Sequence, residues 1–286
     1  FLINLPSANL VHIHLSEPTS ALRKSIFFRI AKMFNKKIIL HFHAFSPDST
    51  IFGKRKELYS KLFNSADIVI VLSSYWKTQV DKIVSNSAKV VVVFNPCPRV
   101  KQADNIEKQK FILFAGTLNE RKGYSDLIKA FALIAGKFQD WRLVFAGNGD
   151  IEAATELSKS LGILNQVEFK GWVSGNEKEK LFAAASVFCL PSYAEGFPMA
   201  VLDAWAYGLP VIATPVGGLP DIAVHGENAM IFKPGDIEGL KENLEILLSD
   251  KLFREKLRTA SLKLSNEIFD IKVIAHQIDE LYSTLV

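Results

Sequence analysis

Residues 187–214, VFCLPSYAEGFPMAVLDAWAYGLPVIAT, show the alternation on which the fold of the whole chain depends. Residues 187–191 are a solid apolar run, residues 198–208 have helical spacing and end at a glycine, and residues 211–214 form a second apolar run. Solid apolar runs of this length are typical of parallel strands that are covered on both faces. The stretch therefore predicts one strand–helix–strand unit.

The same alternation recurs along nearly the whole sequence. We expect a first group of strands at residues 10–15, 37–44, 68–73 and 90–95, and a second group at residues 111–116, 142–147, 167–171, 187–191, 211–214 and 229–232. Segments between these runs have apolar residues at helical spacing. Regular alternation of strands and helices predicts a doubly wound α/β architecture.

Residues 95–110, NPCPRVKQADNIEKQK, separate the two groups of strands. The stretch has two prolines, six charged residues and no hydrophobic periodicity, which is typical of a linker. We therefore predict two Rossmann-like domains with parallel sheets, over residues 1–98 and 111–269, joined by residues 99–110. The amphipathic segment 270–286 is expected to pack back on the first domain.

Composition excludes several classes of protein. The chain has 286 residues and is 49% hydrophobic, so disorder is not expected. It has no run of about 18 uncharged apolar residues, and Cys97 and Cys189 lie far apart without C-x-x-C spacing, which suits a reducing cytoplasm. The sequence begins with Phe1 and enters a strand-like run almost at once, so we expect its natural start to lie upstream.

Charge is distributed unevenly along the chain. Residues 1–110 carry 17 Lys/Arg and 7 Asp/Glu, a net charge of +10, whereas residues 111–286 carry 17 and 23, a net charge of −6. A basic first part favours contact with an anionic ligand or surface. Because the basic residues lack interleaved aromatic residues in loops, a nucleic-acid partner is not expected.

Ligands of doubly wound sheets bind beyond the carboxyl ends of the strands, so the loops there decide the chemistry. AGTLNERKG, residues 115–123, sets Lys122 before a helix, where a lysine and backbone N–H groups suit a phosphate. AGNGD (146–150), GWV (171–173) and TPVGGLPD (214–221) supply further glycines. A plain glycine turn explains any one of these loops, but their coincidence favours a ligand site.

Two acids flank the helix that begins near residue 198. Pro198 is expected at the first helical position and Gly208 at the left-handed end. Met199 and Asp203 are four residues apart and share a face, and Glu195 lies just ahead of the helix. A helix N-terminus attracts anions and carboxylates accept hydrogen bonds from hydroxyl groups, so this layout favours a sugar–diphosphate–ribose ligand. Simple solvation of both acids is the alternative.

Three stretches of the sequence resemble one family of enzymes. They are AGTLNERKG (115–123), LPSYAEGFPMAVLDAWAYGLPVIATPVGGLPD (190–221) and FKPGD (232–236). Over residues 10–286 the chain resembles the group 1 (family 4) retaining glycosyltransferases of GT-B fold. The resemblance implies a nucleotide-sugar donor bound mainly by the second domain and an acceptor bound mainly by the first. It also implies no metal and no cofactor, and a UDP-sugar is favoured over a GDP-sugar.

The resemblance implies roles for individual residues. Glu195 corresponds to the acid that contacts the donor sugar, Lys122 to the lysine on the donor phosphates, and His43 to the histidine near the transferred sugar. The implied donor-binding residues are Gly116, Thr117, Arg121, Val173, Gly196, Phe197, Pro198, Met199, Ala200 and Asp203. Among them the backbone of Val173 would contact the base, and Asp203 stands where the family has a ribose-binding glutamate.

The sequence departs from the family's pattern in three places. Asp203 is one methylene shorter than glutamate, and Thr117 stands where the family usually has arginine, which leaves one positive charge fewer unless Arg121 replaces it. The strand and glycine-rich loop with which the family's first domain usually begins are missing. We therefore expect the first domain to be incomplete at its N-terminus.

Two histidine pairs suggest an alternative site. HIH (12–14) and HFH (41–43) lie on adjacent expected strands, and imidazoles at i and i+2 could ligate zinc. No Asp or Glu lies within either run to complete such a site. We therefore favour a structural role for His12 and His14, and expect no metal.

The expected activity is transfer of a hexose to a hydroxyl of a glycan or lipid-linked acceptor, with retention, in cell-surface polysaccharide synthesis. The alternatives are a non-catalytic or fragmentary GT-B partner subunit and a non-hydrolysing nucleotide-sugar 2-epimerase. Residues 23–37, RKSIFFRIAKMFNKK, carry six basic residues and no acid among apolar ones. They predict either an ordinary core helix or contact with the anionic inner face of a bacterial plasma membrane.

Overall fold

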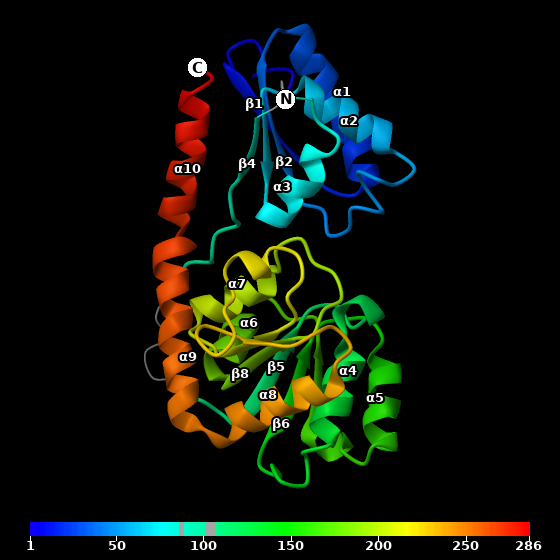
Figure 1. The fold of residues 1–286 in the computed structure, drawn as a ribbon, viewed down its shortest axis with the longest axis vertical. Coiled ribbons are helices and arrows are strands. Elements are labelled where there is room, and N and C mark those ends of the chain that lie inside the picture. Colours follow the sequence, from blue (N-terminus) through cyan, green and yellow to red (C-terminus); the bar gives the residue numbers. More distant parts are fainter. Residues whose placement is uncertain (86–88, 101–106) are drawn as a thin grey trace. The chain divides into compact units, whose positions relative to one another are not determined.

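The computed structural model describes residues 1–85, 89–100 and 107–286 and divides into two compact units. Unit 1 comprises Phe1–Asn95, Glu195–Phe197 and Lys272–Val286, and unit 2 comprises Pro96–Ala194 and Pro198–Ile271. Each unit is a parallel sheet with helices packed against it, as the sequence predicts (Figure 1). Within the described ranges, no helix combines the length and the apolar character that a bilayer span requires.

Unit 1 contains a four-stranded sheet in the order β1-β2-β3-β4. The strands are β1 (Leu10–Leu15), β2 (Lys37–Phe42), β3 (Ile68–Val71) and β4 (Lys89–Val92). Spatial neighbours are also neighbours in sequence, so the described chain winds in one direction across this sheet. In the register of β1 and β2, His14 lies opposite His41.

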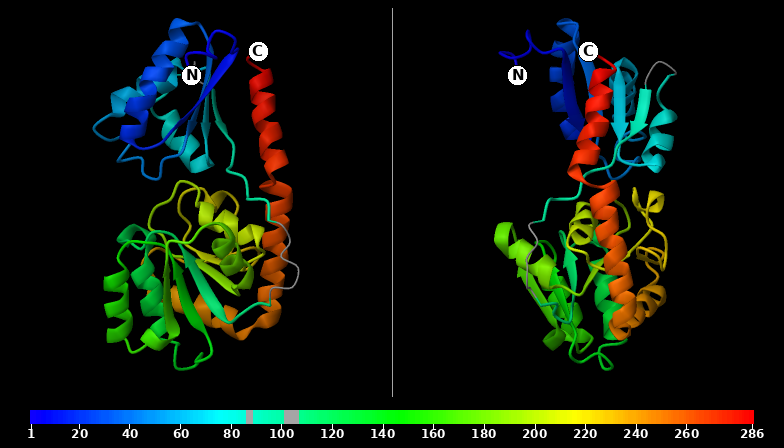
Figure 2. Two further views of the ribbon diagram at one scale, coloured as in Figure 1. Left: turned by 180° about the vertical axis from the view of Figure 1, so that it is seen from behind. Right: turned by 90° about the vertical axis from the view of Figure 1, so that its left-hand side faces the viewer.

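Helices pack on both faces of the unit 1 sheet. α1 (Pro18–Met33), α2 (Lys56–Ser65) and α3 (Ser74–Asp81) share a core with Ile13, Leu40 and Val69 on one face. α10 (Ile271–Ser283), from the end of the chain, contributes Ile274 to a second core with Ile39 and Ile70. Figure 2 shows α10 running beside these strands. Side chains alternate between faces along a strand, so the histidines of β1 and β2 lie on the α10 face.

Unit 2 contains a six-stranded parallel sheet in the order β10-β9-β8-β5-β6-β7. The strands are β5 (Phe111–Ala115), β6 (Arg142–Ala146), β7 (Val167–Gly171), β8 (Val187–Leu190), β9 (Val211–Ala213) and β10 (Met230–Ile231). The chain winds outward from β5 to β7, returns to β8 on the other side of β5, and winds outward again. The order therefore reverses between β5 and β8, which is where doubly wound sheets bind ligands.

Within the described part of unit 2, four helices connect successive strands from β5 to β9, and two more follow β10. They are α4 (Tyr124–Ala132), α5 (Ile151–Ser160), α6 (Gly175–Ala184), α7 (Met199–Ala206), α8 (Ile237–Ser249) and α9 (Lys251–Lys263). Short 3₁₀ helices lie at Glu120–Lys122, Leu164–Gln166 and Leu219–Asp221, and a π-helical segment lies at Leu264–Ile268.

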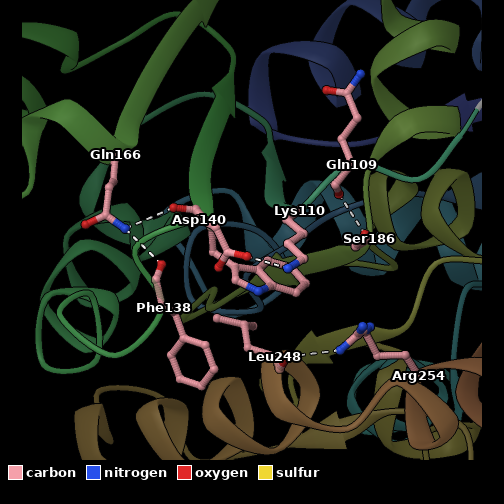
Figure 3. Close-up of polar contacts among 9 residues, drawn as sticks. Gln109, Lys110, Phe138, Asp140, Gln166, Ser186, Leu248 and Arg254 are labelled. Atoms are coloured by element: carbon pink, nitrogen blue, oxygen red, sulfur yellow. Dashed lines mark hydrogen bonds and ion pairs between the residues drawn. The ribbon is translucent and has the colours of Figure 1, made fainter.

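Polar contacts fix the segments that precede the strands of unit 2 (Figure 3). Lys110, just before β5, pairs with Asp140, just before β6. The Gln166 amide, just before β7, donates to the Phe138 carbonyl at 3.0 Å. The amino-terminal edge of this sheet is therefore fixed by the protein's own hydrogen bonds, whereas the loops at its carboxyl edge carry the glycines.

Several strands are shorter than the sequence predicts, and each loses residues at its carboxyl end. β2 ends at Phe42 rather than at residue 44, β3 at Val71 rather than at 73, and β8 at Leu190 rather than at 191. Apolar composition extends past the point where the backbone leaves the sheet to form a loop. Of the predicted linker, residues 101–106 lie outside the described ranges.

Candidate functional site

The loop between β5 and α4 places a lysine over a glycine. Gly116 has φ +153°, and a Cβ built on it would lie 3.7 Å from Lys122 Cε and 4.0 Å from Lys122 Nζ. The short turn that carries Lys122 is capped by Asn119, whose Oδ1 accepts a hydrogen bond from Lys122 N–H at 3.1 Å. The aliphatic stem of Lys122 therefore lies against bare backbone, and Thr117 is exposed beside it.

Arg121 ties this loop to the loop after β8. Its guanidinium donates to the Ala194 carbonyl at 2.7 Å, and Tyr193 N–H donates to the Arg121 carbonyl at 2.7 Å. Gly123 has φ +67°, and a Cβ there would stand 2.1 Å from the Pro191 carbonyl oxygen. The two loops thus meet at the point where the strand order reverses, and only glycine fits at this contact.

The loops after β6 and β7 continue the same edge. A Cβ on Gly147 would stand 1.9 Å from the Gly116 carbonyl oxygen, so the β5 and β6 loops touch through their backbones. A Cβ on Gly171 would lie 3.8 Å from Asn148 Oδ1, which brings the β7 loop to the β6 loop. Val173, half-buried, follows in the β7 loop. Loops from neighbouring strands therefore form one row along the carboxyl edge of unit 2.

α7 begins one residue later than the sequence predicts. Pro198 is the N-cap residue, with φ −71° and ψ 108°, rather than the first helical residue. Its carbonyl accepts the first bonds of the helix, from Val201 N–H at 3.0 Å and Leu202 N–H at 3.4 Å. Met199 and Ala200 precede those donors, so their N–H groups lie at the positive end of the helix dipole.

Asp203 has a partner within unit 2 that the sequence does not reveal. Its carboxylate pairs with Lys178 Nζ of α6 at 2.7 Å, and the residue is 9% exposed. A buried carboxylate is costly without a partner, and Lys178 supplies one from a side chain that is itself 40% exposed. A ligand hydroxyl that binds the Asp203 carboxylate would therefore share its oxygens with the Lys178 ammonium group.

Three residues of the predicted site lie in unit 1, although they fall between β8 and α7 in sequence. They are Glu195, Gly196 and Phe197. Glu195 and Phe197 are buried, and the Phe197 ring lies 5.5 Å from the ring of Phe94. A Cβ on Gly196 would stand 2.6 Å from the Ala44 carbonyl oxygen just after β2, so this contact also requires glycine.

His43, the remaining predicted site residue, belongs to a histidine cluster in unit 1. The cluster consists of His12, His14, His41 and His43, whose ring centroids lie 4.2–5.4 Å apart in the contacting pairs. His14 Nδ1 lies 2.8 Å from His43 Nε2, and His12 Nδ1 lies 2.7 Å from the Tyr282 hydroxyl of α10.

Burial keeps the histidine cluster neutral. Desolvation, followed by the charge of neighbouring histidines, lowers the pKa of His41 to about 2 and the pKa of His12 and His43 to about 4. Desolvation, followed by the charge of Lys24, also lowers the pKa of His14. At neutral pH these rings therefore offer neutral donors and acceptors rather than cations.

The predicted residues thus fall into two sets. Unit 2 gathers Gly116, Thr117, Arg121 and Lys122 with the α7 N-terminus at the reversal of strand order, with Val173 along the same edge and Asp203 within α7. Unit 1 holds Glu195, Gly196, Phe197 and His43. Sequence reasoning missed Lys178, Tyr193, Asn148 and Tyr282. Of these, Asn148 could have been found, because it lies inside the glycine-rich stretch AGNGD.

Solved structures show which fold this arrangement belongs to. HepE of Anabaena, solved in complex with UDP, matches with a TM-score of 0.84 and 19% identity, over 99% of this chain and 80% of that one. A sucrose-phosphate synthase of Thermosynechococcus elongatus matches with a TM-score of 0.80 and 21% identity, over 98% of this chain and 74% of that one. The fold is therefore that of the GT-B glycosyltransferases.

The family model of the group 1 glycosyl transferases matches residues 98–264, more than half of the chain. The chain belongs to this family. It is 28% identical over 239 residues to the 2-deoxystreptamine N-acetyl-D-glucosaminyltransferase of Niallia circulans, covering 83% of this chain and 56% of that protein. It is 24% identical over 290 residues to the N-acetyl-alpha-D-glucosaminyl L-malate synthase of Bacillus anthracis, covering 96% and 74%. The chain spans about half the length of several curated relatives that it matches.

Proposed function

We propose that this chain carries the donor site of a retaining glycosyltransferase, which moves a hexose from a nucleoside-diphosphate sugar to a hydroxyl of a glycan or lipid-linked acceptor. The setting we propose is cell-surface polysaccharide synthesis. Family membership supports the class of reaction, and the names of the two curated relatives support a sugar as the transferred group.

One observation carries the proposal. Where the strand order of unit 2 reverses, Lys122 lies over Gly116, beside the loop that leads to the N-terminus of α7. Bare glycine backbone, an ammonium group and a helix N-terminus together form a site suited to a diphosphate.

The row of loops after β8, β5, β6 and β7 is long enough for an extended nucleoside-diphosphate sugar. β8, β5, β6 and β7 are consecutive neighbours, so their carboxyl ends span three strand spacings, about 14 Å. We place the sugar near the α7 N-terminus, the phosphates at Lys122 and the base at the backbone of Val173. A UDP-sugar is favoured over a GDP-sugar, and the transfer step uses no cofactor or metal.

The proposed reaction needs charge stabilisation more than a protein nucleophile. The acceptor oxygen bonds to the anomeric carbon on the face that the leaving phosphate vacates, and the bond from that carbon to the phosphate oxygen breaks. The acceptor proton passes to the leaving phosphate. Lys122 and the N–H groups of Met199 and Ala200 would stabilise the charge that develops on the diphosphate. Glu195 and His43 would position the sugar.

The donor is tested by a thermal-shift panel. UDP-, GDP- and ADP-glucose and their N-acetylglucosamine counterparts are added at equal concentration to the 286-residue chain, and the same panel is run on Lys122→Ala. A ligand that binds the native state raises its melting temperature. We expect the UDP-sugars to give the largest shift, and the shift to shrink in the variant. No shift with any nucleotide sugar would contradict the donor site.

Two alternatives rest on specific features of the site. A non-catalytic partner subunit is favoured by Asp203, whose carboxylate is already paired with Lys178, and by Thr117 in place of the family's arginine. A non-hydrolysing nucleotide-sugar epimerase would use the same two-unit architecture. Release of free nucleoside diphosphate only when an acceptor sugar is present supports the transferase. Epimerised donor without release would instead support the epimerase.

We also propose that α1 contacts an anionic membrane surface on the cytoplasmic side. Phe28 and Ala31 of α1 face the core, whereas Ile26, Phe27 and Met33 are exposed among the basic residues of positions 23–37. Exposed apolar groups with a basic rim suit the headgroup region of such a surface. Co-sedimentation with vesicles should rise with their content of anionic lipid and fall in Phe27→Ser. Equal binding to neutral vesicles would contradict this role.

A further inference from the structure

We propose that His12, His14 and His41 bind one divalent transition-metal ion, for which zinc is the reference ion. One ring nitrogen from each of these side chains lies within 4.8 Å of the other two. Three histidines and an open fourth position are a common zinc ligand set in proteins. All three residues belong to unit 1, so the inference does not depend on the proposed transferase activity.

Orphaned ring nitrogens are the first observation behind this site. His12 Nε2 and both ring nitrogens of His41 are buried and have no hydrogen-bond partner among the described residues. His41 is 5% exposed, so bulk water does not reach its ring. A buried polar atom without a partner costs about 1–3 kcal/mol. A bound ion would take one lone pair from each ring and so supply partners for two of these three atoms.

The hydrogen bonds around the ligands have the pattern of a metal site. His12 is held through Nδ1 by the Tyr282 hydroxyl, at 2.7 Å, and His14 through Nδ1 by His43 Nε2, at 2.8 Å. In both rings Nε2 is therefore the nitrogen left for an ion. Histidines that bind metals are oriented in this way by a bond from their second nitrogen. Tyr282 and His43 are thus positioning residues of the proposed site.

All three proposed ligands lie within strands β1 and β2, so the sheet itself brings them together. His14 lies opposite His41 in the parallel register, and His12 is two residues earlier on the same face. Tetrahedral zinc, with bonds of 2.0–2.1 Å, needs ligand nitrogens about 3.3 Å apart. The nitrogens must therefore approach by up to about 1.5 Å, which rotation of the side chains allows. Binding should turn the rings out of the stack in which His12 and His14 lie 4.7 Å apart.

An open cavity reaches two of the three proposed ligands. It has a volume of about 340 Å³ and is lined by both His12 and His14. Lys24 also lines this cavity, and its charge opposes a cation there. The fourth position would therefore favour an anionic ligand such as hydroxide or chloride over neutral water. Bound in this way, the ion would connect β1 and β2 and, through Tyr282, hold α10 on the sheet.

The test measures metal binding by the 286-residue chain, freed of metal with a chelator and dialysed. Zn²⁺ is titrated by calorimetry, and Co²⁺ serves as a spectroscopic probe of coordination. We expect one Zn²⁺ per chain, the intense visible absorption of tetrahedral Co²⁺, and a rise in melting temperature. His12→Gln and His14→Gln should each abolish the tetrahedral Co²⁺ spectrum. Tyr282→Phe should weaken Zn²⁺ binding about tenfold, as loss of an orienting partner does.

The chain supplies matched controls. His225→Gln and His276→Gln remove histidines outside the cluster and should leave the stoichiometry and the Co²⁺ spectrum unchanged. His12 and His14 are less buried than His41, so their variants are preferred to His41→Gln, and far-UV circular dichroism checks that they fold. The proposal is overturned by binding that His12→Gln and His14→Gln leave intact, by an octahedral Co²⁺ spectrum, or by no Zn²⁺ bound.

Discussion

The two sheets carry different chemistry although both are parallel: unit 2 in the loops at its carboxyl edge, unit 1 on one face of its strands. In unit 2 the strand order reverses, and the loops on either side of the reversal carry glycines, a lysine and a helix N-terminus. In unit 1 the described strands wind in one direction, and neighbouring strands present stacked imidazoles. At the reversal the β5 and β8 loops meet through glycine backbone beside a lysine and a helix N-terminus, which suits an anion. Winding in one direction keeps side chains in register, which suits a cluster of ligands.

The largest expected effect comes from a methyl group added where the β5 and β8 loops of unit 2 meet. Gly123→Ala puts a Cβ 2.1 Å from the Pro191 carbonyl oxygen at φ +67°. A left-handed residue costs about 1–2 kcal/mol and an overpacked contact about 1–3 kcal/mol more, so we expect a loss of about 2–5 kcal/mol. Urea unfolding followed by tryptophan fluorescence measures it, because Trp141 and Trp205 report on unit 2.

Gly162 provides the matched control for this substitution. It has φ +72°, but no atom lies within 4 Å of the Cβ that alanine would add. Gly162→Ala should therefore cost only the backbone strain, about 1–2 kcal/mol. Equal losses in the two variants would show that the contact between the β5 and β8 loops does not hold unit 2 together.

Removal of the ammonium group from the β5 loop should have the next largest effect. Lys122→Ala is expected to slow transfer about 100-fold through kcat, because a charge-stabilising group acts mainly in the transition state. Lys129→Ala, at an exposed position of α4, is the control and should leave kcat unchanged. Initial rates of nucleoside-diphosphate release provide the measurement. A Lys122→Ala enzyme with unaltered kcat would place the lysine outside the reaction.

The sequence predicted the local parts of both regions and missed the long-range ones. The Gly116–Lys122 loop and the helix followed by the left-handed Gly208 are predictable from residue order, because glycine and helix-end chemistry act over a few residues. Lys178 lies on a different helix from Asp203, and Tyr282 lies 270 positions from His12. No periodicity links such residues. They meet only after the sheets have formed, so their pairing is a property of the tertiary fold.

Acidification should weaken unit 1 more than unit 2. The pKa of His41 is lowered to about 2 and that of His12 and His43 to about 4 in the folded state, whereas an unfolded histidine titrates near 6.5. Below about pH 6.5 the unfolded chain therefore binds more protons, and the stability of unit 1 falls as the pH falls toward 4. From pH 7 to pH 6 each of these rings should cost about 0.7 kcal/mol, about 2 kcal/mol together.

Proton NMR titration of the histidine ring signals, with chelator present, tests this directly. The ring signals of His12, His41 and His43 should still report neutral imidazoles at pH 5. Urea unfolding of unit 1 at pH 7 and pH 6 gives the accompanying loss of stability. Titration of the cluster near pH 6.5 would mean that its rings are well hydrated, and the contrast between the two sheets would then be weaker than the structure indicates.

The smallest effect is expected at Asp203, where the two interpretations of unit 2 diverge. If Asp203 binds the donor ribose, Asp203→Asn removes the charge that accepts the ribose hydroxyl. Binding of UDP should then weaken about three- to tenfold, roughly 1 kcal/mol. Lys178→Gln removes the partner at 2.7 Å, and because Lys178 is 40% exposed, that pair contributes at most about 1 kcal/mol to stability.

Calorimetry with UDP separates the roles. A donor ligand requires that Asp203→Asn weaken binding while Lys178→Gln leaves it unchanged or tighter, because the carboxylate is then released to the ribose. If both variants bind UDP like the parent chain, Asp203 serves only to fix α6 on α7.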